Sequence, residues 1–221
     1  MKQPFQKEGW HMPPKPKFTR EQITEAAYKI ASIKGLDAVQ AREVGKSLGS
    51  TARPIFTVFT GMDELKEAVR ALAQKRCLEE LSGAFNYRPA FKEFGMRCIR
   101  YAVEKPHLYT MVFSDAGGPA AIKEIFGSLT ERVIDSAVEA FGLSRDRAET
   151  LMDQMIVFSN GISAFSLRGG EQLSEAELAK TISEVCIGMV IRFQMLDGHF
   201  RPEGVRMMLE QPDLIPSPVS K

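Results

Sequence analysis

Residues 40–65 read QAREVGKSLGSTARPIFTVFTGMDEL, and this stretch decides the expected fold of the N-terminal part of the chain. Two short helical segments are joined by a tight turn at Leu48 and Gly49, and an aromatic pair, Phe56 and Phe59, follows the turn. A further helix begins directly after this pair. This order of elements is typical of a helix-turn-helix.

Capping signals place helices on both sides of the turn. Thr19 and Gln22 have the spacing of a capping box, which predicts a first helix that ends at Gly35. Thr51 is the expected cap of the segment after the turn. Thr60 and Asp63 are expected to form a second capping box. The apolar face of the first helix contains Ile23, Ala26, Ala27, Ile30 and Ile33.

Helical periodicity continues to the end of the chain, without strand signals and without an internal repeat. We therefore expect an all-α protein with an N-terminal three-helix helix-turn-helix domain and a C-terminal helical bundle. The later helices are predicted over residues 62–84, 88–104, 106–114, 119–141, 144–167, 174–196 and 203–210. The expected division is a flexible arm (1–18), a helix-turn-helix domain (19–65), a helical effector-binding and dimerisation domain (66–210) and a disordered tail (211–221).

Composition narrows the class of protein. With 221 residues, 44% of them apolar, the chain can bury a sizeable core. No apolar run reaches the roughly 18 residues of a membrane helix, and the N-terminus lacks the apolar centre of a signal peptide, so we expect a cytoplasmic protein that does not enter a membrane. Cys77, Cys98 and Cys186 are widely spaced, which favours core thiols over a disulfide or a metal site.

The charged residues are divided unevenly along the chain. Residues 1–62 contain ten Lys and Arg against five Asp and Glu, whereas residues 63–221 contain nineteen against twenty-three. A basic first part suits contact with an anion, although an ordinary solvated surface can carry the same excess. The arm before residue 18 is either a disordered tail or a basic arm that follows the DNA backbone.

Residues 19–65 resemble the DNA-binding domain of the tetracycline-repressor (TetR) family of transcription regulators. The resemblance lies in the arrangement of Ala26-Ala27, Gly35, Val44-Gly45, Leu48-Gly49, Ile55-Phe56, Phe59 and Asp63-Glu64-Leu65. It covers about a fifth of the chain. It implies a homodimer whose two N-terminal domains read a near-palindromic operator and whose helical bodies pair with each other.

The helix after the turn is expected to lie in the major groove. Arg53 is the leading base-reading candidate, because its guanidinium matches guanine O6 and N7, and the alternative is a solvated surface arginine. The resemblance places Phe56 where a tyrosine is usual and Met62 where a lysine is usual, so two phosphate contacts are expected to be missing. The full set of DNA-binding candidates is Gln40, Arg42, Lys46, Thr51, Ala52, Arg53, Phe56 and Thr57.

Two further sites are expected in the body. A pocket rich in methionine and aromatic side chains would suit an apolar or aromatic ligand, although such residues can equally be core. Its candidates are Met96, Tyr101, His107, Tyr109, Met111, Phe113, Met155 and Phe158. The two C-terminal helices would either pair with a second copy or fill an internal core, and the pairing candidates are Phe158, Ile162, Phe165, Val185, Met189 and Phe193.

The sequence therefore predicts a homodimeric transcription regulator, a repressor released from DNA by a small-molecule effector. The alternative is a helical scaffold or ligand carrier with a degenerate DNA-binding domain. The chain lacks Ser-His-Asp, Cys-His and phosphate-loop patterns, and only His11, His107 and His199 could supply imidazole chemistry. We therefore expect no catalytic residues, no cofactor and no bound metal.

Overall fold

The computed structural model describes residues 16–85, 90–168, 174–200 and 202, and this part of the chain contains α-helices and no strand. The predicted all-α class is confirmed. The helices are α1 (Arg20–Lys34), α2 (Ala41–Ser47), α3 (Met62–Leu81), α4 (Ala90–Glu104), α5 (Pro106–Tyr109), α6 (Pro119–Phe126), α7 (Ser128–Phe141), α8 (Arg145–Leu167) and α9 (Glu175–Leu196). Three short elements join them: the 3₁₀ helices η1 (Leu36–Ala38) and η2 (Arg53–Thr57), and the π-helical turn η3 (Thr110–Ser114).

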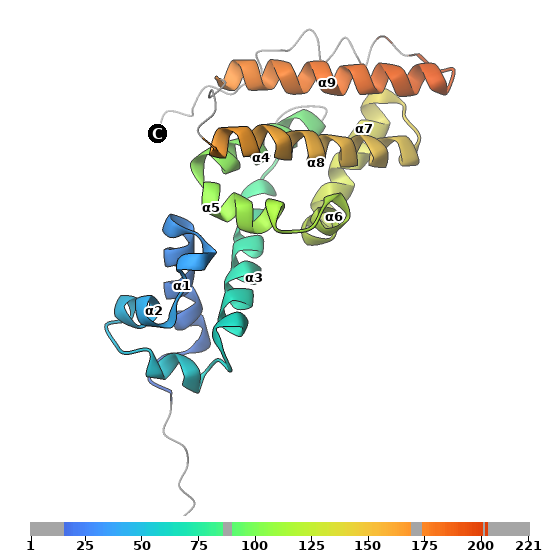
Figure 1. Ribbon diagram of the computed structural model, residues 1–221. Coiled ribbons are helices and arrows are strands. Elements are labelled where there is room, and N and C mark those ends of the chain that lie inside the picture. Colours follow the sequence, from blue (N-terminus) through green and yellow to red (C-terminus); the bar gives the residue numbers. More distant parts are fainter. Residues whose placement is uncertain (1–15, 86–89, 169–173, 201, 203–221) are drawn as a thin grey trace, which may run out of the picture.

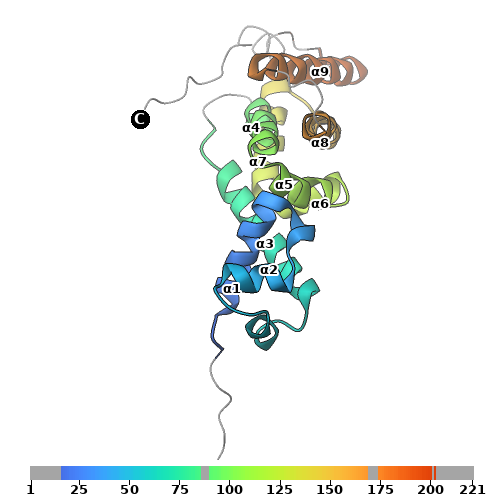
Figure 2. The same cartoon turned by 60° about the vertical axis from the view of Figure 1, so that its left-hand side comes forward.

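The helices form a small N-terminal head and a larger body, joined by α3 (Figure 1). The head consists of α1, η1, α2, η2 and the start of α3. In the body, α8 and α9 contact each other at the end farthest from the head; they run in opposite directions in Figure 1, and Figure 2 shows that they cross at an angle. Most of the predicted arm, the helix predicted over 203–210 and the tail lie outside the described residues. Within the described part, no helix is both long and apolar enough to cross a bilayer.

The first helix begins and ends as its sequence predicts. The Thr19 hydroxyl accepts a hydrogen bond from the Gln22 amide at 3.2 Å, and the Gln22 side chain accepts one from the Thr19 amide at 2.9 Å. Gly35 ends the helix with a φ of +83°, a value that glycine adopts without strain. Ile23 is fully buried, but Ile33 is 73% exposed, so the predicted apolar face stops one turn short.

The segment after the turn is not the α-helix that the sequence predicts. It is the five-residue 3₁₀ helix η2, and Ala52 rather than Thr51 stands at its N-terminus, without a side-chain cap. The amide of Ile55 donates to the carbonyl of Ala52, and the amide of Val58 donates to the carbonyl of Ile55, each at 3.1 Å. This three-residue spacing suits a segment too short to build a regular α-helical ladder.

The cap of α3 also differs from the prediction. Gly61, not Thr60, is the N-cap, so the third helical residue is Glu64 rather than Asp63. Glu64 reaches back and accepts hydrogen bonds from the Thr60 amide at 2.7 Å and the Thr60 hydroxyl at 2.8 Å. The carboxylate therefore satisfies the donors that precede the helix, as in a capping box shifted by one residue.

The body contains one more break than the sequence predicts. Residues 119–141 form two helices, α6 and α7, because the chain turns at Gly127, where φ is +40°. The Thr130 hydroxyl stabilises this turn by donating to the Gly127 carbonyl at 2.7 Å. At the start of α9, the predicted capping box between Ser174 and Glu177 is confirmed.

Helix α3 belongs to both parts of the molecule. Its buried residues recur at every fourth position, and they are Leu65, Val69, Ala73, Cys77 and Leu81. The helix contacts α1 in the head and α4, α6 and η3 in the body. The predicted domain boundary after residue 65 falls within α3, and the division of the chain there stays a prediction.

The turn between α2 and η2 depends on a close approach at Gly45. A Cβ atom at Gly45 would lie 2.7 Å from the carbonyl carbon and oxygen of Thr51, and 2.9 Å from the amide nitrogen of Ala52. These are backbone atoms, which cannot move aside as a flexible side chain does. Glycine is therefore required where α2 crosses the start of η2.

We predict that Gly45→Ala lowers the free energy of unfolding by about 1–3 kcal/mol, because the added methyl group overpacks the turn. Urea unfolding followed by circular dichroism measures this. Ser47→Ala, on the exposed side of the same helix, is the control and should change stability by less than about 0.5 kcal/mol. An increase in stability for Gly45→Ala, which the greater helix propensity of alanine alone would give, would contradict this account.

Candidate functional site

One end of the head carries the residues predicted to contact DNA. Helix α2 packs against η2, so their outer surfaces lie next to each other at the end of the head away from the body (Figure 1). Ala52 is half-buried, and the other seven candidates are exposed: Gln40, Arg42, Lys46, Thr51, Arg53, Phe56 and Thr57. We call this surface the α2–η2 face.

The cations of the α2–η2 face have no internal partners. Arg42, Lys46 and Arg53 form no ion pair with any residue in the described part of the chain. The arm adds a further cation, since Lys17 donates to the Ser50 hydroxyl at 3.3 Å. Positive charges that are exposed and unpaired are available to bind an external anion.

Two positions on the head lack the polar groups that the resemblance leads one to expect. Phe56 exposes 51% of its surface, so an apolar ring rather than a hydroxyl projects from η2. Met62 is half-buried and packs against the apolar core of the head. Neither side chain can donate a hydrogen bond to a phosphate.

A charged cluster fixes the start of α3 against α1. The Arg20 guanidinium lies 2.7 Å from a Glu64 carboxylate oxygen and 4.3 Å from the centre of the Phe59 ring. Hydrogen bonds from Thr60 and Arg20 lower the pKa of Glu64 from 4.5 to about 2. The cluster thus joins α1, the end of η2 and the first turn of α3.

The junction of head and body has a second set of polar contacts. Arg76 of α3 pairs with Glu25 of α1 at 2.7 Å and lies 4.4 Å from the centre of the Tyr28 ring. From the body side, His107 of α5 lies against the end of α1, because a Cβ at Gly35 would be only 3.3 Å from its Nδ1 atom. Helix α5 therefore contacts the head directly.

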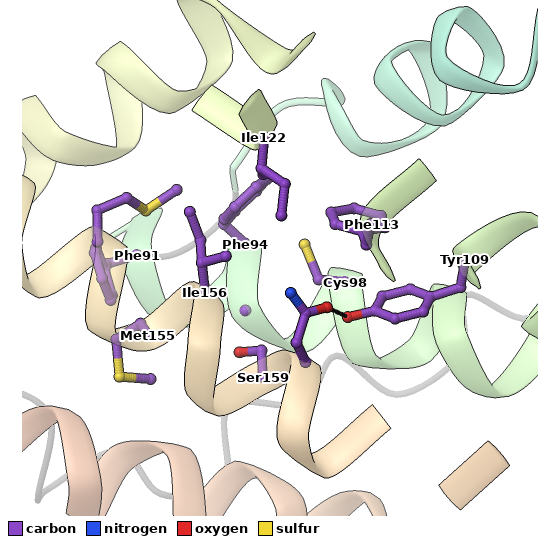
Figure 3. A pocket seen from close by; sticks show the side chains of 12 residues that line it. Phe91, Phe94, Cys98, Tyr109, Phe113, Ile122, Met155, Ile156 and Ser159 are labelled. Atoms are coloured by element: carbon purple, nitrogen blue, oxygen red, sulfur yellow. Dashed lines mark hydrogen bonds between the residues drawn. The ribbon is translucent and has the colours of Figure 1, made fainter. Parts of the chain in front are cut away.

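The body encloses a pocket between α4, α5, η3, α6 and α8 (Figure 3). Twelve residues line it: Phe91, Phe94, Gly95, Cys98, Tyr109, Phe113, Ile122, Met152, Met155, Ile156, Ser159 and Asn160. The enclosed void measures about 30 Å³, within a space of about 440 Å³ that includes its mouth. A void of this size holds about two water molecules, so a larger ligand must displace side chains to enter.

The structure brings together three of the eight predicted ligand-binding residues, namely Tyr109, Phe113 and Met155. The other five lie outside the pocket lining: Met96, Tyr101, His107, Met111 and Phe158. Tyr101, for example, is buried beside Cys77 of α3, and burial raises the pKa of both groups, that of Cys77 to about 12.

Sequence reasoning missed nine lining residues, most of them on α4 and α8. Phe91, Phe94 and Cys98 are separated by three and then four positions, and Met155 and Ile156 follow Met152 by three and four positions, so each set shares one helix face. This spacing was visible in the sequence. It does not show, however, that these two faces meet.

The pocket has an apolar wall and one polar edge. Tyr109 stacks on Phe113 with ring centres 4.6 Å apart, and Phe113 stacks on Phe126 at 5.2 Å. The Tyr109 hydroxyl donates to the Asn160 side-chain oxygen (Figure 3). Burial raises the pKa of Tyr109 and of the Cys98 thiol well above their usual ranges, so both groups are uncharged near neutral pH.

The outer surfaces of α8 and α9 carry most of the predicted pairing residues. Phe165 is 75% exposed, and Phe158, Ile162, Val185 and Met189 are half-buried. Gly161 and Gly188 are exposed on the same two helices, with open space around the position of a Cβ.

Phe193 differs from the other pairing candidates. It is only 1% exposed and lies beneath the Arg147 and Arg192 guanidinium groups, so its ring belongs to the internal core. The burial of Phe193 on the inward side of α9 does not support its prediction as a pairing residue, and the pairing set as a whole stays a prediction.

No family model and no curated protein sequence matches the chain. Among solved structures, it is similar to a tetR-family transcriptional regulator from Streptomyces coelicolor, with a TM-score of 0.62 and 15% identity over 86% of this chain and 88% of that one. The chain has the fold of a TetR-family regulator. A TetR transcriptional regulator from Rhodococcus sp. RHA1 is also similar, with a TM-score of 0.47 and 20% identity over 78% of this chain and 95% of that one.

The charged cluster at Glu64 predicts acid sensitivity within this TetR-type head. A group whose pKa is lower in the folded state stabilises the fold above its unfolded pKa, and this contribution is lost as pH falls towards the folded value. For Glu64 the loss falls between pH 4.5 and about 2. Glu64→Gln should therefore reduce stability at neutral pH and flatten the acid side of the stability profile.

Urea unfolding midpoints measured across this pH range test the prediction. Glu67→Gln is the matched control, because it makes the same chemical change on α3, and within the described residues Glu67 forms its ion pair with Arg70 of its own helix. If both variants have the same pH profile, the Arg20–Glu64–Thr60 cluster does not hold the head together.

Proposed function

We propose that this protein is a homodimeric, DNA-binding transcription regulator. The observation that carries the proposal is the α2–η2 face, where Arg42, Lys46 and Arg53 are exposed and form no ion pair within the described residues, at the end of a head with the TetR-type fold. In the proposed complex, η2 enters the major groove of double-stranded DNA in the cytoplasm. We further propose that the regulator is a repressor, released from a near-palindromic operator by a small apolar or aromatic ligand.

The side chains of the α2–η2 face suit two different roles, reading bases and binding phosphates. Arg53 begins η2 and can donate two parallel hydrogen bonds to a guanine edge. Arg42 and Lys46 lie on α2, beside the reading element, where they can bind phosphates and set the register on the duplex. The exposed Phe56 ring offers an apolar surface for a sugar or a thymine methyl group.

A second copy of the chain supplies the second reading head in this proposal. One such head buries too little surface for specific binding, so two half-sites are needed. The exposed apolar residues and exposed glycines of α8 and α9 support pairing there, because small residues allow helices of two copies to approach closely.

Helix α5 and η3 are the proposed route from the pocket to the head. Tyr109 and Phe113 line the pocket, and His107, two residues earlier, lies against Gly35 at the end of α1. A ligand that displaces these rings shifts the same short segment that supports the head. The ligand releases DNA by binding preferentially to the state in which the spacing of the two heads does not match the two half-sites.

One observation favours a second function, that of a helical scaffold or ligand carrier with a degenerate head. Phe56 and Met62 supply no donor for phosphates, which weakens the electrostatic part of DNA binding. The two functions differ in salt dependence and in base preference. A degenerate head makes fewer phosphate contacts, so its binding would be weak, would change less with salt and would show no base preference.

We predict that the protein binds DNA upstream of its own gene with strong salt dependence. Arg53→Ala should reduce discrimination between operator and mismatched DNA by about 1–3 kcal/mol. Lys46→Ala should weaken binding to all sequences alike and lower the slope of log K against log salt by about 1 per reading head. Fluorescence anisotropy over a salt series measures both effects.

Lys75→Ala is the control for these variants, because Lys75 is exposed on α3, outside both the α2–η2 face and the proposed pairing helices, and it pairs with Glu79 of its own helix. It should leave both affinity and salt slope unchanged. Sequence-blind binding by the wild-type protein would instead support the degenerate head, and unchanged base preference in Arg53→Ala would remove Arg53 as the reading residue.

We predict that Phe165→Asp weakens dimerisation by tenfold or more, by an order-of-magnitude estimate for the loss of a central apolar contact. Ile33→Asp is the control, because Ile33 is 73% exposed and Phe165 is 75% exposed, but Ile33 lies on α1 in the head. Light scattering over a dilution series measures both. Equal effects of the two variants, or a wild-type monomer at micromolar concentration, would contradict pairing through α8 and α9.

A further inference from the structure

The pocket contains no charged group that could neutralise an ionised ligand. None of its twelve lining residues is Lys, Arg, His, Asp or Glu. A ligand carboxylate or ammonium would therefore lose its hydration without gaining an opposite charge, which is strongly unfavourable in an apolar site.

Three cations on the helices around the pocket already form ion pairs outside it. Arg97 of α4 pairs with Glu93 and also donates to the carbonyls of Leu81, Gly83 and Ala84, so it secures the end of α3. Lys123 of α6 pairs with Asp153 of α8 at 2.8 Å, and Lys105 pairs with Glu80 of α3. Moving any of these cations into the pocket would break an existing ion pair.

The polar edge of the pocket offers hydrogen-bond donors. The Tyr109 hydroxyl donates to the Asn160 oxygen, which orients the amide so that its N–H groups remain available. No described residue accepts a hydrogen bond from them. Tyr109 therefore positions Asn160 to donate to a ligand.

Ser159 adds a second polar group at the same edge. Ser183, Thr181 and Thr150 on α8 and α9 each donate to the carbonyl four residues earlier, as hydroxyl groups within helices often do. Ser159 has no such bond and no other partner among the described residues, although it is only 8% exposed. Its hydroxyl lines the pocket (Figure 3).

We propose that the pocket binds an uncharged, mainly aromatic or apolar ligand that carries one carbonyl group, a ketone, ester or amide, whose oxygen accepts hydrogen bonds from Asn160 and Ser159. This rests on the pocket being the effector site of the proposed function, and it names the chemical class of that effector. The stacked rings of Tyr109 and Phe113 favour a flat ligand, and Met152 and Met155 can change rotamer to admit it.

Three probes with the same ring system test this class. Acetylnaphthalene carries the carbonyl group, ethylnaphthalene replaces it with a methylene group, and naphthoate replaces it with a carboxylate. Titration calorimetry on the purified full-length protein should show acetylnaphthalene binding roughly tenfold or more tightly than either of the others. Ethylnaphthalene has no acceptor for the buried hydrogen bond, which contributes about this factor, and naphthoate must lose its hydration without gaining an opposite charge.

Asn160→Leu, which removes one of the two donors at similar volume, should reduce the preference for acetylnaphthalene over ethylnaphthalene by about fivefold, because the carbonyl oxygen then accepts a hydrogen bond only from Ser159. Ser159→Ala is a smaller change that preserves the packing of α8, and it should reduce the same preference in part. A thermal unfolding transition for each variant establishes that it is folded.

Several outcomes would overturn the proposal. These are tighter binding of naphthoate, an unchanged preference for the carbonyl probe in both variants, and failure of all three probes to bind the wild-type protein. The calorimetry uses no DNA, so it separates the two conclusions. If the protein binds the carbonyl probe but no operator DNA, the regulator is refuted and the ligand class is retained. If it binds operator DNA but prefers naphthoate, the ligand class is refuted and the regulator is retained.

Discussion

The buried stripe along α3 is the constraint on which the rest of the structure depends. Its buried residues, from Leu65 to Leu81, recur every four positions. Because an α-helix turns about 100° per residue, each step rotates the stripe by about 40°, and the whole series rotates it by about 160°. The first part of the stripe can therefore face the head while the last part faces the body.

The polar contacts of α3 are also divided between the head and the body. Arg76 pairs with Glu25 of α1, whereas the next residue, Cys77, lies beside Tyr101 of α4. Two neighbouring positions on one helix thus connect to different parts of the molecule. Helix α3 packs against α1 in the head and against α4, α6 and η3 in the body, so it connects the two parts through direct contacts at both ends.

Features set by short-range chemistry could be predicted from the sequence. The capping boxes at Thr19 and Ser174 involve residues three positions apart, so their geometry is encoded locally. The break at Gly127 was missed, because the apolar pattern continues through it and only the packed structure requires a positive φ there. The position of Phe193 on the inner side of α9 was missed for a related reason, since periodicity defines a face but not what covers it.

The candidate sites divide in the same way. The sequence could predict that the residues of the α2–η2 face share one surface, because the turn is short and residues close in sequence are close in space there; their role in DNA binding stays a prediction. The pocket could be predicted only in part, because α4 and α8 are distant in sequence and their contact depends on tertiary packing. Asn160 was missed altogether, because its role depends on the hydroxyl of Tyr109, fifty-one positions earlier.

The ion pairs of the head and body are separate from both candidate sites, the α2–η2 face and the pocket. Arg20, Arg76 and Arg97 are each paired, and their contacts join α1, α3 and α4, whereas Arg42, Lys46 and Arg53 of the α2–η2 face form no ion pair within the described residues. In the proposed regulator, an uncharged ligand leaves those structural pairs intact. The ligand instead displaces the rings of Tyr109 and Phe113, which belong to the same α5–η3 segment that places His107 against the end of α1. A small apolar molecule could then move a head without disturbing the charges that bind DNA.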